Sequence, residues 1–361
     1  MHSYYYKDNL TALEAKFAAQ KLAFAPAAFQ TAKAMVDLHI LKAIEDSKND
    51  GLTIEAIIEK TGLSSYAVKL LMEFSLGLEL IKIVPNSEPQ AYVLGKTGYF
   101  LLNDELTKAN MNFINDVCYQ GFFYLQDSLK TGKPAGLKVF GDWDTIYQGL
   151  SALPKQVQKS WFAFDHYYSD SIFGAALPIV FKENPRHIMD IGSNTGKFTK
   201  AALSYNNEVL VTMVDLAPQI AMAQNNPELE AFKNRIESYP TNILNHDEQL
   251  PSNVDTVWMS QFLDCFSLEE IQNILKKIKR CVPSDCNIFV LEPLWDMQRF
   301  EAASYSIQAT SIYFAAMANG NSKMYSYSDL VGAIEAVGCT LVRAHHNLGI
   351  NSYSLLQFHV S

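Results

Sequence analysis

The pattern of hydrophobic and polar positions divides the chain into a helical first half and a second half in which strands and helices alternate. Residues 11–47 carry apolar side chains at helical spacing, and residues 104–182 are mostly helical in pattern and rich in aromatic side chains. From Arg186 onward, short apolar runs alternate with amphipathic segments. Strands are expected near residues 187–191, 208–214, 235–239, 254–259, 287–292, 339–345 and 353–359. Helices are expected near residues 196–205, 217–225, 267–280, 299–318 and 327–337.

This alternation predicts the fold of the second half. Strands connected by helices form a mostly parallel sheet that is covered on both faces. Only residues 347–352 connect the last two strands, and this segment is too short for a helical crossover, so these strands are expected to form an antiparallel hairpin. The expected fold class is α/β, a mostly parallel, doubly wound, Rossmann-like seven-stranded sheet with an α-helical winged-helix domain at the N-terminus.

The winged-helix prediction comes from capping residues and from a short hairpin. Thr53 can cap a short helix that ends at Gly62, and Ser64 or Ser65 can cap the next helix. Two β-like segments within residues 80–94 follow and resemble a wing. This order of helix, turn, helix and wing is typical of a winged-helix domain.

Three regions are therefore expected along the chain. They are a winged-helix domain over residues 1–103, a helical connector over residues 104–182 and an α/β domain over residues 183–361. The aromatic connector, which includes His166, stands directly ahead of the α/β domain. We expect one part of its aromatic side chains to be core and another part to line a ligand cavity.

Composition and charge exclude several functional classes. The net charge of −9 disfavours nucleic acid and anionic membranes, and the segment Thr53–Leu78 contains fewer basic than acidic residues. The five cysteines are odd in number and form no metal-like pairs, so no metal site is expected. The N-terminus does not have the order of a signal peptide, and no apolar run approaches the roughly 20 residues that span a bilayer. A cytoplasmic protein is expected.

The segment after the first strand of the α/β domain carries the most informative motif. It reads Asp190-Ile-Gly192-Ser-Asn-Thr-Gly196, which differs from the Gly-x-Gly-x-x-Gly spacing of dinucleotide sites. A carboxylate at the strand end repels a pyrophosphate and attracts the cationic amino-acid end of S-adenosylmethionine. Asp215, at the end of the second strand, is placed to accept hydrogen bonds from ribose hydroxyl groups. An ordinary βαβ unit without a ligand is the structural alternative.

Together these features resemble the class I S-adenosylmethionine-dependent methyltransferases, and specifically the small-molecule O-methyltransferases with an N-terminal winged-helix dimerisation domain. The likeness covers nearly the whole chain. In the family, the first loop reads Asp-Val-Gly-Gly-Gly-x-Gly, and here Ser193 and Asn194 replace two of the glycines. Asp215 matches the family's acid on the second strand. Asn242 takes the place of the acid that meets the adenine amino group, and its amide oxygen can still accept that hydrogen bond.

The resemblance implies a cofactor, an acceptor and a partner. The cofactor is S-adenosyl-L-methionine, which becomes S-adenosyl-L-homocysteine, the methyl acceptor is a small molecule, and the chain forms a homodimer through its N-terminal domain. The implied cofactor-binding residues are Asp190, Gly192, Gly196, Asp215, Leu216, Asn242 and Ser260. The implied acceptor pocket includes His166, Met297, Arg299 and Phe300.

The fourth family motif departs from the pattern at the catalytic position. The family has a histidine there as general base, and in the favoured register Asp264 takes its place, whereas sliding by one residue puts Leu263 there. An unperturbed carboxylate with a pKa near ~4 is a poor base for a phenol near ~10. Asp264 can serve as the base if burial raises its pKa or if the substrate hydroxyl is unusually acidic. Alternatively, Asp264 caps the helix that starts near Ser267.

The sequence therefore predicts methylation of a hydroxyl group on a small aromatic or polyketide-like compound. N- or C-methylation, or chemistry without methyl transfer, is the first alternative, because the family histidine is missing. A winged-helix regulator that senses a ligand through its α/β domain is the second, and the acidic recognition helix argues against it.

Overall fold

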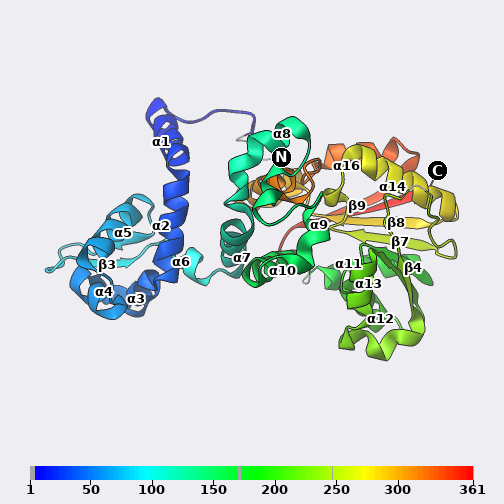
Figure 1. The fold of residues 1–361 in the computed structure, drawn as a ribbon, viewed down its shortest axis with the longest axis horizontal. Coiled ribbons are helices and arrows are strands. Elements are labelled where there is room, and N and C mark those ends of the chain that lie inside the picture. The colour runs from blue at the N-terminus through cyan, green and yellow to red at the C-terminus, as the bar shows by residue number, and fades with distance from the viewer. Residues whose placement is uncertain (1–4, 170–171, 246, 361) are drawn as a thin grey trace. The chain divides into compact units, whose positions relative to one another are not determined.

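The computed structural model describes residues 5–169, 172–245 and 247–360, and it divides the chain into two compact units between Asn115 and Asp116 (Figure 1). Each unit has a hydrophobic core of its own.

The first unit is mostly helical and contains a small antiparallel sheet in the order β1-β3-β2. The Thr53 and Ser64 hydroxyls accept the backbone N–H groups of Ala56 and Ala67, and Gly62 ends the first of the two capped helices in a left-handed conformation. The predicted caps and the predicted hairpin are therefore present. Its helices are α1 (Ala12–Ala23), α2 (Ala25–Asp37), α3 (Ile40–Asp46), α4 (Ile54–Thr61), α5 (Ser65–Gly77), α6 (Lys96–Asn103) and α7 (Glu105–Phe113). Its strands are β1 (Leu52–Thr53), β2 (Ile81–Ile83) and β3 (Ala91–Leu94).

The second unit begins with short helices that correspond to the predicted aromatic connector. They include α8 (Leu125–Thr131), α9 (Ile146–Gly149), α10 (Lys155–Ser169) and α11 (Phe173–Val180). Trp161 from α10 donates its indole N–H to the Tyr313 hydroxyl at 2.8 Å, which ties the connector to a helix from much later in the chain.

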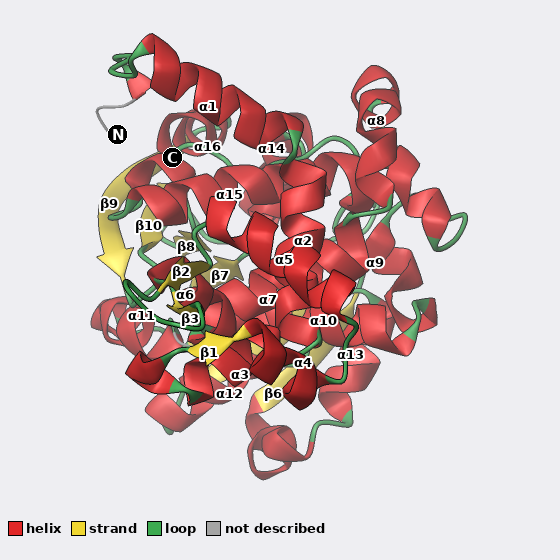
Figure 2. Cartoon of the chain, turned by 90° about the vertical axis from the view of Figure 1, so that its left-hand side faces the viewer, coloured by secondary structure: helices red, strands yellow, loops and turns green. Residues whose placement is uncertain are grey.

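A seven-stranded sheet forms the centre of the second unit, in the order β6-β5-β4-β7-β8-β10-β9. All neighbouring strands are parallel except β10, which is antiparallel to both β8 and β9. Figure 2 shows β9 at one edge of this sheet, beside β10. The predicted fold class is confirmed. The strands are β4 (His187–Ile191), β5 (Leu210–Asp215), β6 (Ile236–Pro240), β7 (Thr256–Ser260), β8 (Asn287–Glu292), β9 (Cys339–Leu348) and β10 (Tyr353–Val360).

Helices cover both faces of this sheet, with α14 and α16 on one face and α11, α12 and α13 on the other (Figure 1). The helix expected over residues 299–318 is present as an α-helix followed by a π-helical turn, Phe314–Ala318. Among the described residues, no helix is both long and apolar enough to cross a membrane. The helices are α12 (Lys197–Tyr205), α13 (Ala217–Gln224), α14 (Leu268–Cys281), α15 (Glu301–Tyr313) and α16 (Tyr327–Glu335).

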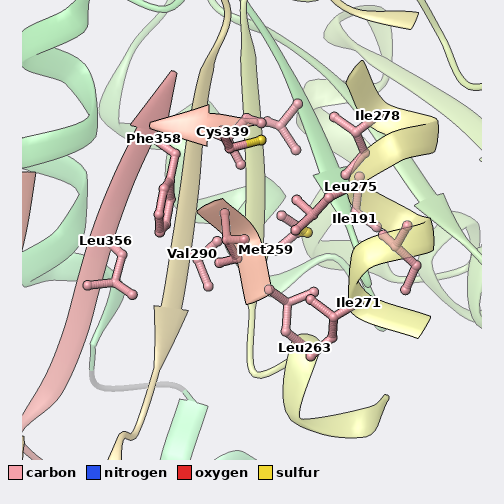
Figure 3. Close-up of a cluster of buried hydrophobic side chains, with 14 of the residues drawn as sticks. Ile191, Met259, Leu263, Ile271, Leu275, Ile278, Val290, Cys339, Leu356 and Phe358 are labelled. Atoms are coloured by element: carbon pink, nitrogen blue, oxygen red, sulfur yellow. The ribbon is translucent and has the colours of Figure 1, made fainter. Parts of the chain in front are cut away.

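Apolar clusters on the two faces hold the sheet in place. On one face, the buried side chains Ile271, Leu275 and Ile278 of α14 pack against strand residues (Figure 3). On the other face, the Phe198 ring stacks on Trp258 at 4.0 Å with an interplanar angle of 6°. Full burial of one large apolar side chain contributes about 1.5–3 kcal/mol. These contacts fix the strands, so that their ends form a rigid edge.

Candidate functional site

The candidate site lies at the carboxyl edge of the sheet, where four parallel strands end side by side. Ile191 at the end of β4 pairs with Val214 of β5 on one side and with Met259 of β7 on the other. Ser260 of β7 pairs with Leu291 of β8. Because these strands are parallel and in register, the residues at and just after their ends form one row along this edge. Ligands of open α/β sheets bind at this kind of edge.

The loop after β4 requires glycine at both framing positions. Gly192 and Gly196 have φ values of +78° and +80°, a region that side chains rarely adopt. A Cβ atom on Gly192 would lie 2.4 Å from the Phe262 ring, and one on Gly196 would lie 2.6 Å from a methyl group of Leu229. The pair of glycines that the sequence singles out therefore shapes this loop.

Asp215 holds the loop to the start of α13. Its Oδ2 atom accepts the backbone N–H of Asn194 at 2.8 Å, and its Oδ1 atom accepts that of Leu216, the N-cap residue of α13, at 2.7 Å. Burial raises the pKa of Asp215, and the two backbone hydrogen bonds lower it. Each carboxylate oxygen can still accept a further hydrogen bond from a ligand.

Asp190 lies in the interior at the end of β4. It is 2% exposed, and its Oδ2 atom accepts the Thr199 hydroxyl at 2.7 Å. Burial raises the pKa of Asp190 to about 7, the Thr199 hydrogen bond lowers it, and the charge of Asp215 raises it further. Near neutral pH this carboxyl group is therefore divided between its neutral and charged forms.

Besides one oxygen of Glu292 at the end of β8, three buried polar atoms at this edge have no hydrogen-bond partner within the described parts of the chain. They are Ser193 Oγ in the loop after β4, Gln219 Oε1 in the first turns of α13 and Ser260 Oγ at the end of β7. A buried polar group without a partner costs about 1–3 kcal/mol. Three such atoms along one edge are what a site for a polar ligand requires.

Only one of these three residues, Ser260, is among the residues that the sequence singles out. The sequence signal for Ser193 is that it replaces a glycine of the family loop. Gln219 lies in no motif, so its place in the site became visible only in the fold.

Asn242 follows β6, the strand next to β5, and its side chain is exposed. Its Oδ1 atom accepts the backbone N–H of Leu244 at 3.0 Å, which closes a local turn. A carbonyl oxygen has two lone pairs, so one remains for a ligand.

Asp264 lies in the single turn η9 (Leu263–Cys265) and does not cap the helix that follows. The Ser267 hydroxyl is the N-cap of α14, and Ser267 and Glu270 form a reciprocal capping box. The prediction that Asp264 caps this helix is therefore wrong, because η9 places Asp264 before the capping position. Instead, Asp264 is 6% exposed, and its Oδ1 atom accepts the Cys265 thiol at 3.5 Å.

Buried polar groups surround Asp264. Tyr147 from α9 donates its hydroxyl to Cys265 Sγ at 3.2 Å. The pKa of Asp264 is raised to about 7, because burial and the charge of Asp165 on α10 raise it by more than the hydrogen bond from Cys265 lowers it. Asp264 thus meets the condition that a carboxylate base needs, a pKa well above its usual range.

Glu292 ends β8 and lies against the turn that carries Asp264. Its Oε1 atom accepts the backbone N–H groups of Phe262 and Leu263, at 3.0 and 2.9 Å. Burial raises the pKa of Glu292 well above its usual value, and the charge of Asp264 raises it further. The position of Glu292 after a strand suggests a site residue, but its sequence alone equally fits a strand-end turn.

The four residues expected in the acceptor pocket lie in two places. His166 is half-buried on α10, where its ring lies 5.9 Å from that of Phe162. Arg299 and Phe300 are exposed, with the guanidinium 5.2 Å from the Phe300 ring. Met297 and Arg299 line a hollow of about 470 Å³, and Asp264 is not among its described lining residues. This hollow is also lined by Asp296, Gln298 and Asn347.

Comparison with known families gives two matches along the chain. Residues 16–87 match the Dimerisation2-like domain, and residues 154–334 match the O-methyltransferase domain. The L-tyrosine C(3)-methyltransferase of Streptomyces lavendulae is 21% identical over 319 residues, which cover 87% of this chain and 84% of that protein.

Solved structures of methyltransferases have the same fold. The apo form of the S-adenosylmethionine-dependent methyltransferase SibL superposes with a TM-score of 0.72 at 18% identity, covering 95% of this chain and 98% of that chain. The O-methyltransferase NcsB1 from neocarzinostatin biosynthesis, in complex with S-adenosylmethionine and 2-hydroxy-5-methyl naphthoic acid, gives a TM-score of 0.67 at 16% identity. That match covers 93% of this chain and 96% of that chain.

Proposed function

Because this chain belongs to the O-methyltransferase domain family, it is an S-adenosylmethionine-dependent methyltransferase, and we propose that it methylates a hydroxyl group of a small aromatic or polyketide-like molecule. The bound cofactor supplies an electrophilic methyl group on a positively charged sulfur. The proposal rests on one observation, a row of groups at one sheet edge that can hydrogen-bond a ligand. They are the Asp215 carboxylate and the unpartnered Ser193 and Ser260 hydroxyls, beside the glycine loop.

In this proposal, different residues of the row bind different parts of the cofactor. Asp190, Gly192 and Gly196 hold its methionine end, and the glycines leave the space that a side chain would fill. Asp215 accepts hydrogen bonds from the ribose hydroxyl groups. The remaining contacts are made by Leu216, Asn242 at the adenine, and Ser260.

Asp264 is the proposed base for the acceptor hydroxyl. Its support is burial, which brings the pKa of this carboxyl to about 7 and closer to the ~10 of a phenol. Half-buried His166 lies one residue from Asp165, whose charge acts on Asp264, and it is proposed to line the acceptor pocket. Met297, Arg299 and Phe300 are proposed to contact the outer part of the acceptor.

Transfer to a ring carbon is the second candidate, and the L-tyrosine C(3)-methyltransferase relative favours it. A phenol that has lost its proton is nucleophilic at oxygen and at the neighbouring ring carbons, so the same base serves both reactions. The proton NMR spectrum of the methylated product separates the two, because an O-methyl and an aryl C-methyl group resonate at different shifts.

We also propose a homodimer formed through the N-terminal domain. Its support is the match to a dimerisation domain and the helix α1, in which no residue is buried within the chain. Leu13 and Phe17 expose 80% and 58% of their surface. Light scattering should show a dimer for the native chain and a monomer for Leu13→Glu/Phe17→Glu, whereas the control Gln20→Glu on the same helix stays dimeric. A monomeric native chain would refute the dimer.

Titration calorimetry with S-adenosylmethionine and S-adenosylhomocysteine tests the cofactor site. Asp215→Ala should weaken binding tenfold or more, about 1.4 kcal/mol, because the ribose loses its acceptor. The control Asp285→Ala removes an exposed carboxylate just before β8, at the opposite edge of the sheet, and should bind normally. Equal affinities for folded Asp215→Ala and native protein would show that the assignment of Asp215 is wrong. No binding of either ligand to folded, cofactor-free native protein would overturn the proposed function.

A further inference from the structure

The Glu292 carboxyl is fixed against the backbone of the turn that carries Asp264. One oxygen, Oε1, accepts two consecutive backbone N–H groups, those of Phe262 and Leu263. The side chain is 3% exposed. Its position is therefore set by the same turn that positions Asp264.

The other oxygen of Glu292 is buried and unpaired. Oε2 has no hydrogen-bond partner within the described parts of the chain and almost no contact with solvent. When Glu292 is ionised, this oxygen loses its hydration and no protein group replaces it. The backbone N–H groups on Oε1 lower the pKa of Glu292, but burial outweighs them and favours the neutral acid.

The nearby carboxyl group of Asp264 is a second reason for Glu292 to remain protonated. It is 6% exposed, and its charge acts directly on Glu292. Two neighbouring carboxyl groups in a low-dielectric interior repel each other when both are ionised. One of the pair therefore keeps a proton at neutral pH.

Within the described parts of the chain, the titratable groups whose electrostatic interactions link them to Asp264 or to its neighbour Cys265 are acids and do not neutralise the pair. Burial and the charge of Asp264 raise the pKa of Cys265, Tyr147 and Tyr325, which keeps their protons in place. Asp165 adds a further negative influence. These groups are Cys265 on η9, Tyr147 on α9, Asp165 on α10, Tyr313 on α15 and Tyr325 in the segment before α16.

We propose that Glu292 and Asp264 form an acid pair that carries one proton, in which Glu292 keeps the proton and Asp264 is the ionised carboxylate that accepts the proton of the acceptor hydroxyl. This inference rests on the proposed function, in which Asp264 is the base. When the acceptor's O–H bond breaks, its electron pair stays on oxygen and the proton moves to Asp264. The pair changes from one proton and a charge of −1 to two protons and no charge, and it returns one proton to solvent after the product leaves.

The raised pKa of Asp264, which comes from burial and from the charge of Asp165, explains how a carboxylate replaces the histidine of the family. A base near pKa ~4 faces a gap of about six pH units to a phenol, whereas a pKa of about 7 for Asp264 leaves a gap of about three. The proton transfer becomes about a thousandfold less unfavourable. Glu292 is a positioning residue in this scheme, since it acts through Asp264 and through the turn.

Infrared spectroscopy of the full-length protein at pH 8, without acceptor, tests the pair. A protonated carboxyl has a C=O stretching band that shifts on exchange from H₂O to D₂O, whereas exposed carboxylates are ionised at this pH and do not contribute. Native protein should show this band, and Glu292→Gln should lose it. Asp264→Asn should keep it, because burial is the largest cause of the raised Glu292 pKa. The control Asp190→Asn should also keep it.

A native protein without the band, or a Glu292→Gln variant that retains it, would overturn the pair. If Glu292→Gln does not fold, native protein labelled with ¹³C-glutamate provides the same information, since one side-chain carboxyl resonance should stay at its protonated position at pH 8. The band does not depend on the cofactor. If the pair is lost and S-adenosylmethionine binding is intact, only this inference is refuted. If the band is present in a protein that does not bind the cofactor, the proposed function and the role of Asp264 as its base are refuted, whereas the protonated Glu292 stands.

Discussion

Replacing Asp190 with asparagine should stabilise the second unit at pH 8, and its advantage over native protein should grow as the pH rises from 5 to 8. Burial raises the folded-state pKa of Asp190 from 3.8 to about 7. Because the folded-state value lies above the unfolded one, the folded protein binds the additional proton between about pH 4 and 7. The stability of the native protein is therefore highest below this range and falls as the pH rises through it.

The magnitude follows from the size of the pKa shift. A shift of about three units corresponds to about 4 kcal/mol at pH 8, where Asp190 is charged in both states. At pH 5 the same linkage costs less than half of this, roughly 2 kcal/mol. Asparagine carries no charge and keeps an oxygen for the Thr199 hydroxyl, but its buried NH₂ group costs about 1–3 kcal/mol without partners. This cost does not vary with pH, so the advantage of Asp190→Asn should be roughly 2–3 kcal/mol larger at pH 8 than at pH 5.

Urea unfolding followed by tryptophan fluorescence measures this difference directly. All four tryptophans, at positions 143, 161, 258 and 295, belong to the second unit, so the signal does not report on the first. The control Asp285→Asn changes an exposed carboxylate and should show the same difference from native protein at both pH values. If the stability difference between Asp190→Asn and native protein is equal at pH 5 and pH 8, burial does not raise the pKa of Asp190 and the reasoning is wrong.

The same unfolding assay checks three local features. Gly192→Ala should cost about 1–3 kcal/mol, because φ is +78° and the new methyl group would lie 2.4 Å from the Phe262 ring, whereas Gly332→Ala has open space in a helix and should gain about 0.5–1 kcal/mol. Equal effects of the two substitutions would contradict the conformational argument. Ser267→Ala should cost about 1 kcal/mol through loss of the α14 N-cap, and no loss would mean that this cap does not hold the helix. Phe198→Ala should lower the free energy of unfolding by about 3–5 kcal/mol, because the buried Phe198 side chain is 4% exposed. A loss below 1 kcal/mol would show that neighbouring side chains move into the cavity.

The elements of the α/β unit could be predicted from the sequence because their signals are local. The apolar run of β8 is observed at residues 287–292 as predicted, and the helix predicted over residues 267–280 is observed at Leu268–Cys281. Capping by Thr53 and Ser64 is equally local, since an N-cap bonds a backbone group only three residues away. The hairpin of the last two strands follows from the length of its connection.

The sequence by itself also located the glycine turn and the acid that are proposed to bind the cofactor, because both stand in order along the chain, the turn after one strand and the acid at the end of the next. Gly192, Gly196 and Asp215 lie together at the predicted edge. What the sequence could not show is which buried atoms at this edge lack partners, since Gln219 Oε1 is identified only by its surroundings.

Only the tertiary structure decided the state of the candidate base. From periodicity and spacing, Asp264 was equally suited to be a helix cap or a base. In the fold, Ser267 is the N-cap of α14, so Asp264 is not the cap. The raised pKa of Asp264 comes from burial and from the charge of Asp165. Glu292, which is proposed to form the acid pair with Asp264, lies at the end of β8. Desolvation and charge repulsion depend on distances between segments far apart in sequence, so they exist only once the sheet and its covering helices have come together.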